Sequence, residues 1–205
     1  FDLLFQQYSD YETLDISLEI IAVVFGILSV WFSKKNNILV YPTGMISTSI
    51  FTYLLFKWSL LGDMMINAYY FVVSVYGWYI WTRKVNNIVT PISKVSSPEK
   101  ITSLIIFFFS LSFVYGIYNY FDKWGSYTSY IDNFTTAIFF VAMWLMANRK
   151  IENWIFWIIG NIISIPLYFY KGLTFTSIQY IIFTVIAISG YYTWKKILDN
   201  SNQTA

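Results

Sequence analysis

Seven long apolar runs, separated by short polar connections, make up most of the chain. They lie at about Leu18–Phe32, Ile38–Phe56, Met64–Thr82, Ile101–Phe121, Ile131–Ala147, Trp154–Tyr170 and Thr174–Trp194. Most of them approach the ~17–25 residues that a membrane-spanning helix needs, and the first and fifth are shorter. Because the runs are continuously apolar rather than alternating, they favour helices over the strands of a β-barrel. The pattern predicts an all-α integral membrane protein with seven transmembrane helices in one bundle.

Composition supports this class and narrows the chemistry. Apolar residues are 57% of the chain and charged residues 12%, against about 25% charged in soluble proteins. The absence of His and Cys excludes disulfides, thiol chemistry and the usual zinc ligands within the chain. The sequence also lacks a Gly-x-x-x-x-Gly-Lys-Ser/Thr loop for ATP. We therefore expect a protein that is not an enzyme, uses no metal or cofactor, and has no nucleic-acid partner.

Basic residues gather in every second connection between the runs. The four groups are Lys34 and Lys35; Arg83, Lys84, Lys94 and Lys100; Arg149 and Lys150; and Lys195 and Lys196. Only Lys57, Lys123 and Lys171 lie in the other connections. By the positive-inside rule the four groups face the cytoplasm, which predicts an outside N-terminus and an inside C-terminus.

A sequence repeat divides the chain into two similar parts. The segment Gly77-Trp78-Tyr79-Ile80-Trp81 recurs 113 residues later as Gly190-Tyr191-Tyr192-Thr193-Trp194, each time before a basic pair. Because three helices reverse the direction of the chain, a single fourth helix would let both triplets start outside, as parallel repeats. Alternatively, the two segments are ordinary interface anchors.

The repeat interpretation gives the expected domain boundaries. They are an outer interfacial segment at 1–15, a first three-helix repeat at 16–84, a linker with the fourth transmembrane helix at 85–121, a second three-helix repeat at 130–196 and a cytoplasmic tail at 197–205. Within the linker, Ser97-Pro98-Glu99 predicts the start of the fourth helix.

The sixth run carries aromatic and polar residues on one helical face. Offsets of three and seven put Trp154, Trp157 and Asn161 within roughly a 60° arc, and Ser164 and Tyr168 continue the stripe. Burying an unpartnered amide in hydrocarbon is costly, so this face should point to protein or to a water-filled cavity. We interpret it as a substrate-binding wall for a flat, polar or cationic solute, and therefore as a sign of transport. Alternatively, the tryptophans pack helices and Asn161 hydrogen-bonds between them.

The wall is expected near the membrane midplane and in the second triplet alone. Asn161 lies about eleven residues from the basic pair at 149–150, or roughly 16 Å along a helix. Pro166 predicts a kink or break just beyond it. With an offset of 116 between the second helices of the triplets, Trp157 corresponds to Tyr41 and Asn161 to Met45.

Three further polar residues are candidates for the pathway. Asn67 and Gln179 lie ten and eleven residues before the repeated glycines. They either line the outer part of a shared cavity or hold the two triplets together. Asp132 opens the fifth run, where a carboxylate can relay protons, act at a gate or attract a cation. It can equally be a solvated acid at a helix N-terminus.

Several motifs that occur together carry a resemblance. They are Glu152-Asn153-Trp154-x-x-Trp157-x-x-x-Asn161, Tyr76-Gly77-Trp78-Tyr79-x-Trp81, Val141-Ala142-Met143 with Asp132 ahead of it, and Ser177-Ile178-Gln179-Tyr180. Over nearly the whole chain, they resemble the PnuC type of bacterial vitamin transporters, a family related in architecture to the sugar-transporting SWEETs. The resemblance implies two parallel three-helix repeats joined by a linker helix, in a homotrimer in the bacterial inner membrane.

The resemblance also implies a function. It is facilitated diffusion of nicotinamide riboside, an NAD precursor, with trapping by phosphorylation in the cytosol and with Trp154, Trp157 and Asn161 as substrate contacts. Asn67 and Gln179 stand where the nicotinamide riboside transporters have Gln and Glu, so another vitamin such as thiamine, also a flat cation, is the alternative substrate. A membrane receptor or structural subunit whose aromatic residues only pack is the second alternative.

Overall fold

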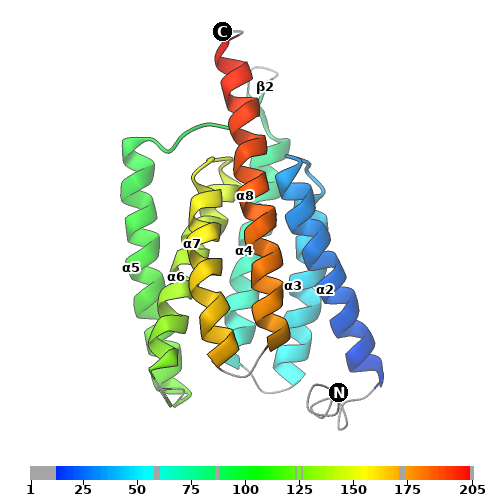
Figure 1. The fold of residues 1–205 in the computed structure, drawn as a ribbon, viewed down its shortest axis with the longest axis vertical. Helices are drawn as coiled ribbons and strands as arrows, with labels where there is room; N and C mark the ends of the chain where they lie inside the picture. Colours follow the sequence, from blue (N-terminus) through cyan, green and yellow to red (C-terminus); the bar gives the residue numbers. More distant parts are fainter. Residues whose placement is uncertain are drawn as a thin grey trace.

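The computed structural model describes residues 13–57, 61–85, 88–122, 124–125, 127–170 and 174–203. Within these ranges it contains seven helices and a short β-hairpin (Figure 1). The elements are α2 (Thr13–Lys34), α3 (Val40–Lys57), α4 (Leu61–Thr82), β1 (Lys84–Val85), β2 (Ile88–Val89), α5 (Ser97–Tyr120), α6 (Thr128–Ala147), α7 (Asn153–Tyr170) and α8 (Thr174–Gln203). Each predicted apolar run corresponds to one helix, so the all-helical fold class is confirmed. Most of the segment expected at 1–15 lies outside the described residues.

The helix boundaries follow from local sequence signals. α5 begins at the predicted Ser97, because Ser96 and Glu99 form a capping box and Pro98 occupies the first turn. α7 continues through Pro166 to Tyr170, so the helix does not break there, and the kink that Pro166 also predicts stays a prediction. α8 runs on to Gln203, which makes most of the expected tail at 197–205 the last turns of a helix.

Six helices form a closed ring. α2, α3 and α4 pack in chain order, as do α6, α7 and α8, and the ring closes where α4 meets α6 and α2 meets α8. The remaining helix, α5, packs along α6 and barely touches α4, so it stands outside the ring, at the left of Figure 1. Side chains that point into the ring can therefore meet from all six helices.

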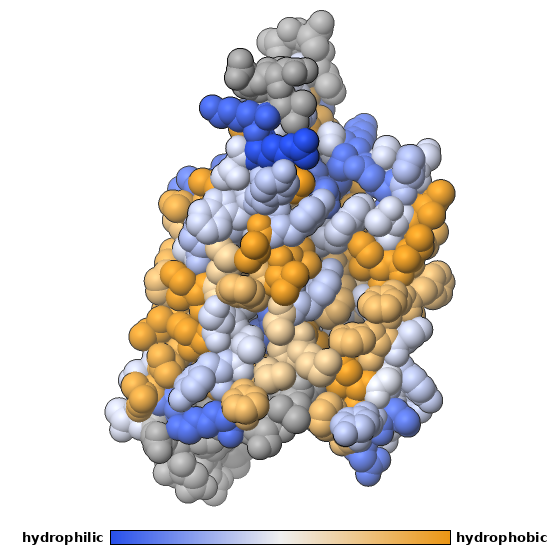
Figure 2. Space-filling model, turned by 180° about the vertical axis from the view of Figure 1, so that it is seen from behind, coloured by the Kyte–Doolittle hydropathy of each residue, from blue (hydrophilic) through white to orange (hydrophobic). Residues whose placement is uncertain are grey.

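The four basic groups lie at one end of the ring, here called the basic end. Hydrogen bonds and an ion pair at this end join the neighbourhoods of Ser33, Lys150 and Trp194. In Figure 1 it is the upper end, where β2 and the C-terminus also lie. Apolar residues predominate over the middle of the face in Figure 2, and strongly hydrophilic residues gather toward both ends, as expected for a protein that spans a bilayer.

Length and composition alone identify part of this membrane-spanning set. Among the described helices, α2, α5, α6 and α7 are long and apolar enough to cross a membrane. The other three, α3, α4 and α8, belong to the same ring and run alongside them (Figure 1).

Candidate functional site

A cavity lies inside the ring, between the two triplets. Its volume is about 310 Å³, at the lower end of the ~300–1,000 Å³ typical of small-molecule sites. All six ring helices contribute to its lining. Five residues predicted from the sequence lie on it, namely Asn67, Trp154, Trp157, Asn161 and Gln179. We call this space the inner cavity.

The helical face predicted on α7 does point inward. Trp154 is 1% exposed and Asn161 3%, whereas Ile155 and Ile159 on the opposite face are more than 40% exposed. Gly160 lets α7 approach α6, because a Cβ at this position would lie 2.3 Å from the Phe139 ring. The close approach brings Trp157 and Asn161 to the inner cavity.

The residues of the wall offer a solute two kinds of contact. The Trp157 ring stacks on Phe139 with 5.4 Å between ring centroids and 28° between planes. It is half-buried and borders the cavity, so a flat solute has an aromatic surface to lie on. The amides of Asn161, Asn67 and Gln179 reach the same space from three helices and can hydrogen-bond polar groups of the solute.

A second, larger cavity of about 540 Å³ adjoins the first, and we call it the outer cavity. The two share four lining residues, Asn67, Tyr70, Phe139 and Tyr180. Asp132 and Tyr168, both predicted from the sequence, line only the outer cavity. Asp132 lies in the second turn of α6 rather than at its first residue.

Two predicted site residues have surroundings that differ from the prediction. Ser164 is fully buried and lines neither cavity. Trp154 borders the inner cavity, but its ring also fills the space beside Gly190, where a Cβ would lie 2.6 Å from it, and meets Trp194 edge-on at 5.6 Å. Trp154 therefore packs α7 against α8, whatever its role toward a solute.

Several cavity residues were not predicted from the sequence. Tyr70, Phe139 and Tyr180 line both cavities, and Ser74 and Met143 line the inner one. Aromatic residues are 22% of the chain, so one more Tyr or Phe in a helix carries little information. The available signal was position, because Tyr180 directly follows Gln179 on α8.

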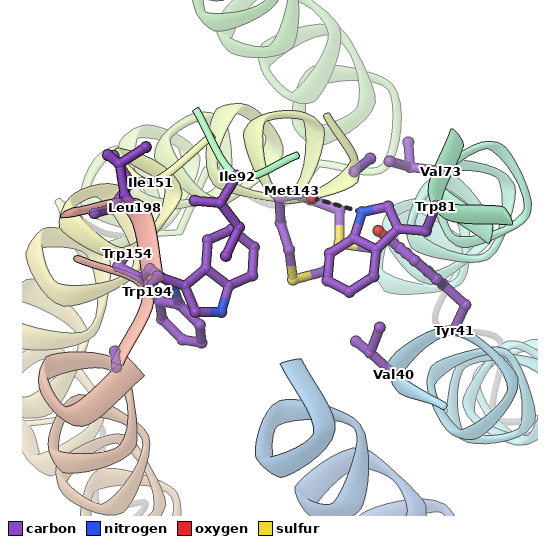
Figure 3. Close-up of a cluster of buried hydrophobic side chains, with 13 residues drawn as sticks. Val40, Tyr41, Val73, Trp81, Ile92, Met143, Ile151, Trp154, Trp194 and Leu198 are labelled. Atoms are coloured by element: carbon purple, nitrogen blue, oxygen red, sulfur yellow. Dashed lines mark hydrogen bonds between the residues drawn. The ribbon is translucent and has the colours of Figure 1, made fainter. Parts of the chain in front are cut away.

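Four large aromatic side chains are buried on the side of the inner cavity that faces the basic end. Tyr41, Trp81, Trp154 and Trp194 come from α3, α4, α7 and α8 and are all at most 2% exposed (Figure 3). The ring centroids of Trp81 and Trp194 lie 5.9 Å apart. Trp81 also meets the Tyr41 ring edge-on, and Trp194 meets the Trp154 ring edge-on. We call these four residues the aromatic plug.

Two matching hydrogen bonds hold the plug. The Trp81 Nε1–H donates to the carbonyl oxygen of Met146 at 3.3 Å, the bond dashed in Figure 3. The Trp194 Nε1–H donates to the carbonyl oxygen of Ser33 at 3.0 Å. The two donors are 113 residues apart in the sequence, and so are the two acceptors. Each triplet therefore ties its last helix to the first helix of the other triplet.

The same offset relates the packing within the triplets. A Cβ at Gly77 would lie 2.4 Å from the Tyr41 ring, and a Cβ at Gly190 would lie 2.6 Å from the Trp154 ring. Tyr41 is thus the counterpart of Trp154, and the alignment of the second helices with an offset of 116 is wrong. At the offset of 113, Trp157 corresponds to Gly44 and Asn161 to Thr48.

A strap formed by the connection from α4 to α5 covers the plug at the basic end. Ser93 pairs with the backbone beside Lys150, and the Val95 N–H donates to the Glu152 carboxylate at 3.0 Å. Arg149 donates to the Thr90 carbonyl and lies 4.1 Å from the centre of the Trp81 ring. Burial lowers the pKa of the Arg149 guanidinium from its usual value, although such a group stays charged near neutral pH. The strap thus holds a cation against the plug.

Comparison with known proteins agrees with this architecture. The family described as nicotinamide mononucleotide transporter matches residues 16–196. The nicotinamide riboside transporter PnuC of Escherichia coli (strain K12) is 23% identical, over 86% of this chain and 84% of its own. The riboflavin/roseoflavin transporter RibM of Streptomyces davaonensis is 22% identical, over 86% and 83%. A crystal structure of the vitamin B3 transporter PnuC superposes with a TM-score of 0.67 at 25% identity, covering 97% of this chain and 86% of that one.

A helical membrane bundle with a cavity of small-molecule size inside its ring, in a chain of this similarity, defines a membrane transport protein of the small-solute class. The family match spans most of the chain, from near the start of α2 to the basic pair of α8. The chain belongs to the nicotinamide mononucleotide transporter family.

Proposed function

We propose that this protein carries nicotinamide riboside across the bacterial inner membrane by facilitated diffusion. The observation that carries the proposal is the convergence of Trp157, Asn161 and Gln179 on one cavity of small-molecule size, in a chain of this family. A structural similarity to a vitamin B3 transporter supports the same substrate.

The cavity chemistry suits this substrate. A pyridinium ring over the Trp157 face gains cation–π attraction of ~0.5–2 kcal/mol, depending on its desolvation. The amides of Asn67, Asn161 and Gln179 can pair with the carboxamide and the ribose hydroxyls, each bond contributing about 0.5–1.5 kcal/mol. We propose these residues, with Trp154 at the edge of the wall, as the substrate contacts.

Thiamine remains the alternative substrate, because it is also a flat cation and meets the same aromatic and amide groups. Riboflavin is neutral and larger, so it gains no cation–π attraction. A membrane receptor or structural subunit whose aromatic residues only pack would transport neither solute. Uptake of radiolabelled nicotinamide riboside and of thiamine into proteoliposomes that contain the purified protein separates these alternatives. We expect nicotinamide riboside to equilibrate without being concentrated; uptake of thiamine alone, or of neither solute, would overturn the assignment.

We further propose that the ring consists of two parallel three-helix repeats joined by a linker helix, α5, which lies outside the ring. Three observations support this: α3 and α7 begin 113 residues apart, as do α4 and α8; the plug bonds match at this offset; and Asn36 and Arg149 share a positive φ of 51° and 52°. Rocking of one repeat against the other would separate Trp81 from Trp194 and open the inner cavity toward the basic end.

The basic end is proposed to face the cytoplasm, with the N-terminus outside. Because the chain has no Cys, single cysteines report orientation without background. Lys35→Cys and Lys196→Cys, exposed at the basic end, should be shielded from an impermeant thiol reagent outside intact cells, and Asp122→Cys at the other end should react. The reverse labelling would invert the topology. Arg149 is too buried to serve as such a position.

Trapping of the riboside by cytosolic phosphorylation and assembly as a homotrimer are proposals that rest on the family resemblance. Light scattering of the detergent-purified protein, corrected for bound detergent, measures the number of chains. A mass of three chains supports the trimer, and a monomer contradicts it.

A further inference from the structure

The outer cavity differs in chemistry from the inner one. Its lining carries one acidic side chain, several hydroxyls and a group of aromatic rings, namely Asp132; Thr128, Ser129, Thr135 and Thr136; and Tyr70, Tyr118, Phe139, Tyr168 and Tyr180. Among the described residues that line the two cavities, Asp132 is the one that carries a formal charge at neutral pH. The outer cavity therefore has a negative group that the inner cavity lacks.

Stacked rings connect the two cavities. Tyr168 stacks on Tyr180 at 5.1 Å, Tyr180 on Phe139 at 6.2 Å, and Phe139 on Trp157 at 5.4 Å, with 28° or less between the planes of each pair. The first ring lines only the outer cavity, the next two line both, and Trp157 lines only the inner one. These four rings, which we call the aromatic path, extend without interruption from the side of Asp132 to the proposed substrate contact.

We infer that the outer cavity is a separate recruitment site for organic cations, in which Asp132 supplies the charge and the aromatic path leads the ring to Trp157. A carboxylate in a partly enclosed cavity attracts a cation more strongly than it would in bulk water. The aromatic faces then compensate for the water that the cation loses as it moves inward. The inference rests on the proposed function, since it requires a cationic substrate.

If the outer cavity recruits cations, removing its charge should slow uptake at low substrate concentration and leave the maximum rate of uptake unchanged. Asp132→Asn keeps the size of the side chain and one of its two acceptor oxygens but removes its charge. Initial uptake of nicotinamide riboside well below saturation should fall by about tenfold, at the lower end of electrostatic steering effects. Uptake at saturating concentration should change little. Asp132→Glu should retain most of the parental rate.

Two readouts distinguish recruitment from a purely structural role. The first compares nicotinamide riboside, a cation, with its reduced dihydropyridine form, which is neutral and of nearly equal size; Asp132→Asn should slow only the cation. The second is the dependence of cation uptake on ionic strength, which should be steep in the parent and shallow in Asp132→Asn. Asp122→Asn is the matched control, because it removes an exposed acid at a position whose positive φ of 50° suits Asn.

The possible failures are distinct from one another. If the parent does not take up nicotinamide riboside, the proposed function fails. If the parent does but Asp132→Asn slows neither form, or if its salt dependence equals that of the parent, the recruitment site is wrong. Equal slowing of both forms by Asp132→Asn and by Asp132→Glu would make Asp132 a structural residue.

Discussion

In the first triplet, α2 to α4, the Tyr41 ring occupies the space beside Gly77; in the second, α6 to α8, the Trp154 ring occupies the space beside Gly190. Trp81 and Trp194 repeat the correspondence with their matching hydrogen bonds. The residues that face the cavity do not correspond in this way, because at the offset of 113 Trp157 and Asn161 align with Gly44 and Thr48. Matching positions pack the ring, and positions that differ give the cavity its one-sided chemistry.

The largest expected effect concerns the matching glycines, which should be equally intolerant of a side chain. Gly77→Ala and Gly190→Ala each push a methyl group into a buried aromatic ring and should lower the free energy of unfolding by up to about 3 kcal/mol. The measurement is thermal unfolding of the purified variants, followed by tryptophan fluorescence.

The control for the glycine variants is Gly116→Ala on α5, where no atom lies within 4 Å of the added Cβ. It should unfold at or above the parental temperature. A large loss for only one of the two ring glycines would break the comparison between the triplets.

A smaller effect is expected from the plug. Trp81→Phe and Trp194→Phe each remove one indole hydrogen bond, worth about 0.5–1.5 kcal/mol, and should loosen the packing of the aromatic plug to a similar extent. Ser74→Cys, on the inner cavity, reports the opening through its rate of reaction with a thiol reagent added at the basic end. Both Phe variants should raise that rate about equally, and an increase with one alone would mean that the plug does not work as a matched pair.

Much of the fold followed from the sequence, for physical reasons. Continuous apolar runs must form helices in a bilayer, since each backbone N–H needs a partner there. The Ser97-Pro98-Glu99 segment predicted the start of α5, and the spacing of Trp154, Trp157 and Asn161 predicted which face of α7 points to the interior. These features depend only on local geometry.

What the sequence did not predict depends on contacts between helices. The expected offset of 116 between the second helices is wrong, because the ring contacts of Gly77 and Gly190 and the two plug hydrogen bonds all keep an offset of 113. The cavity roles of Tyr70, Phe139 and Tyr180 require knowing which neighbours face each helix. Pro166 leaves α7 unbroken, a result that its missing N–H alone does not predict.

The most direct test of the central claim is calorimetric titration of nicotinamide riboside into the purified parent and three variants. Trp157→Ala removes the aromatic face and Asn161→Leu leaves a polar group of the solute unpaired, so each should weaken binding by about 1–3 kcal/mol, or roughly 5- to 150-fold in Kd. Thr48→Val, at the position that corresponds to Asn161 in the other triplet, borders the same cavity and should change Kd less than about threefold. Equal weakening by Thr48→Val and Asn161→Leu, or unchanged affinity in Trp157→Ala and Asn161→Leu, would contradict the account.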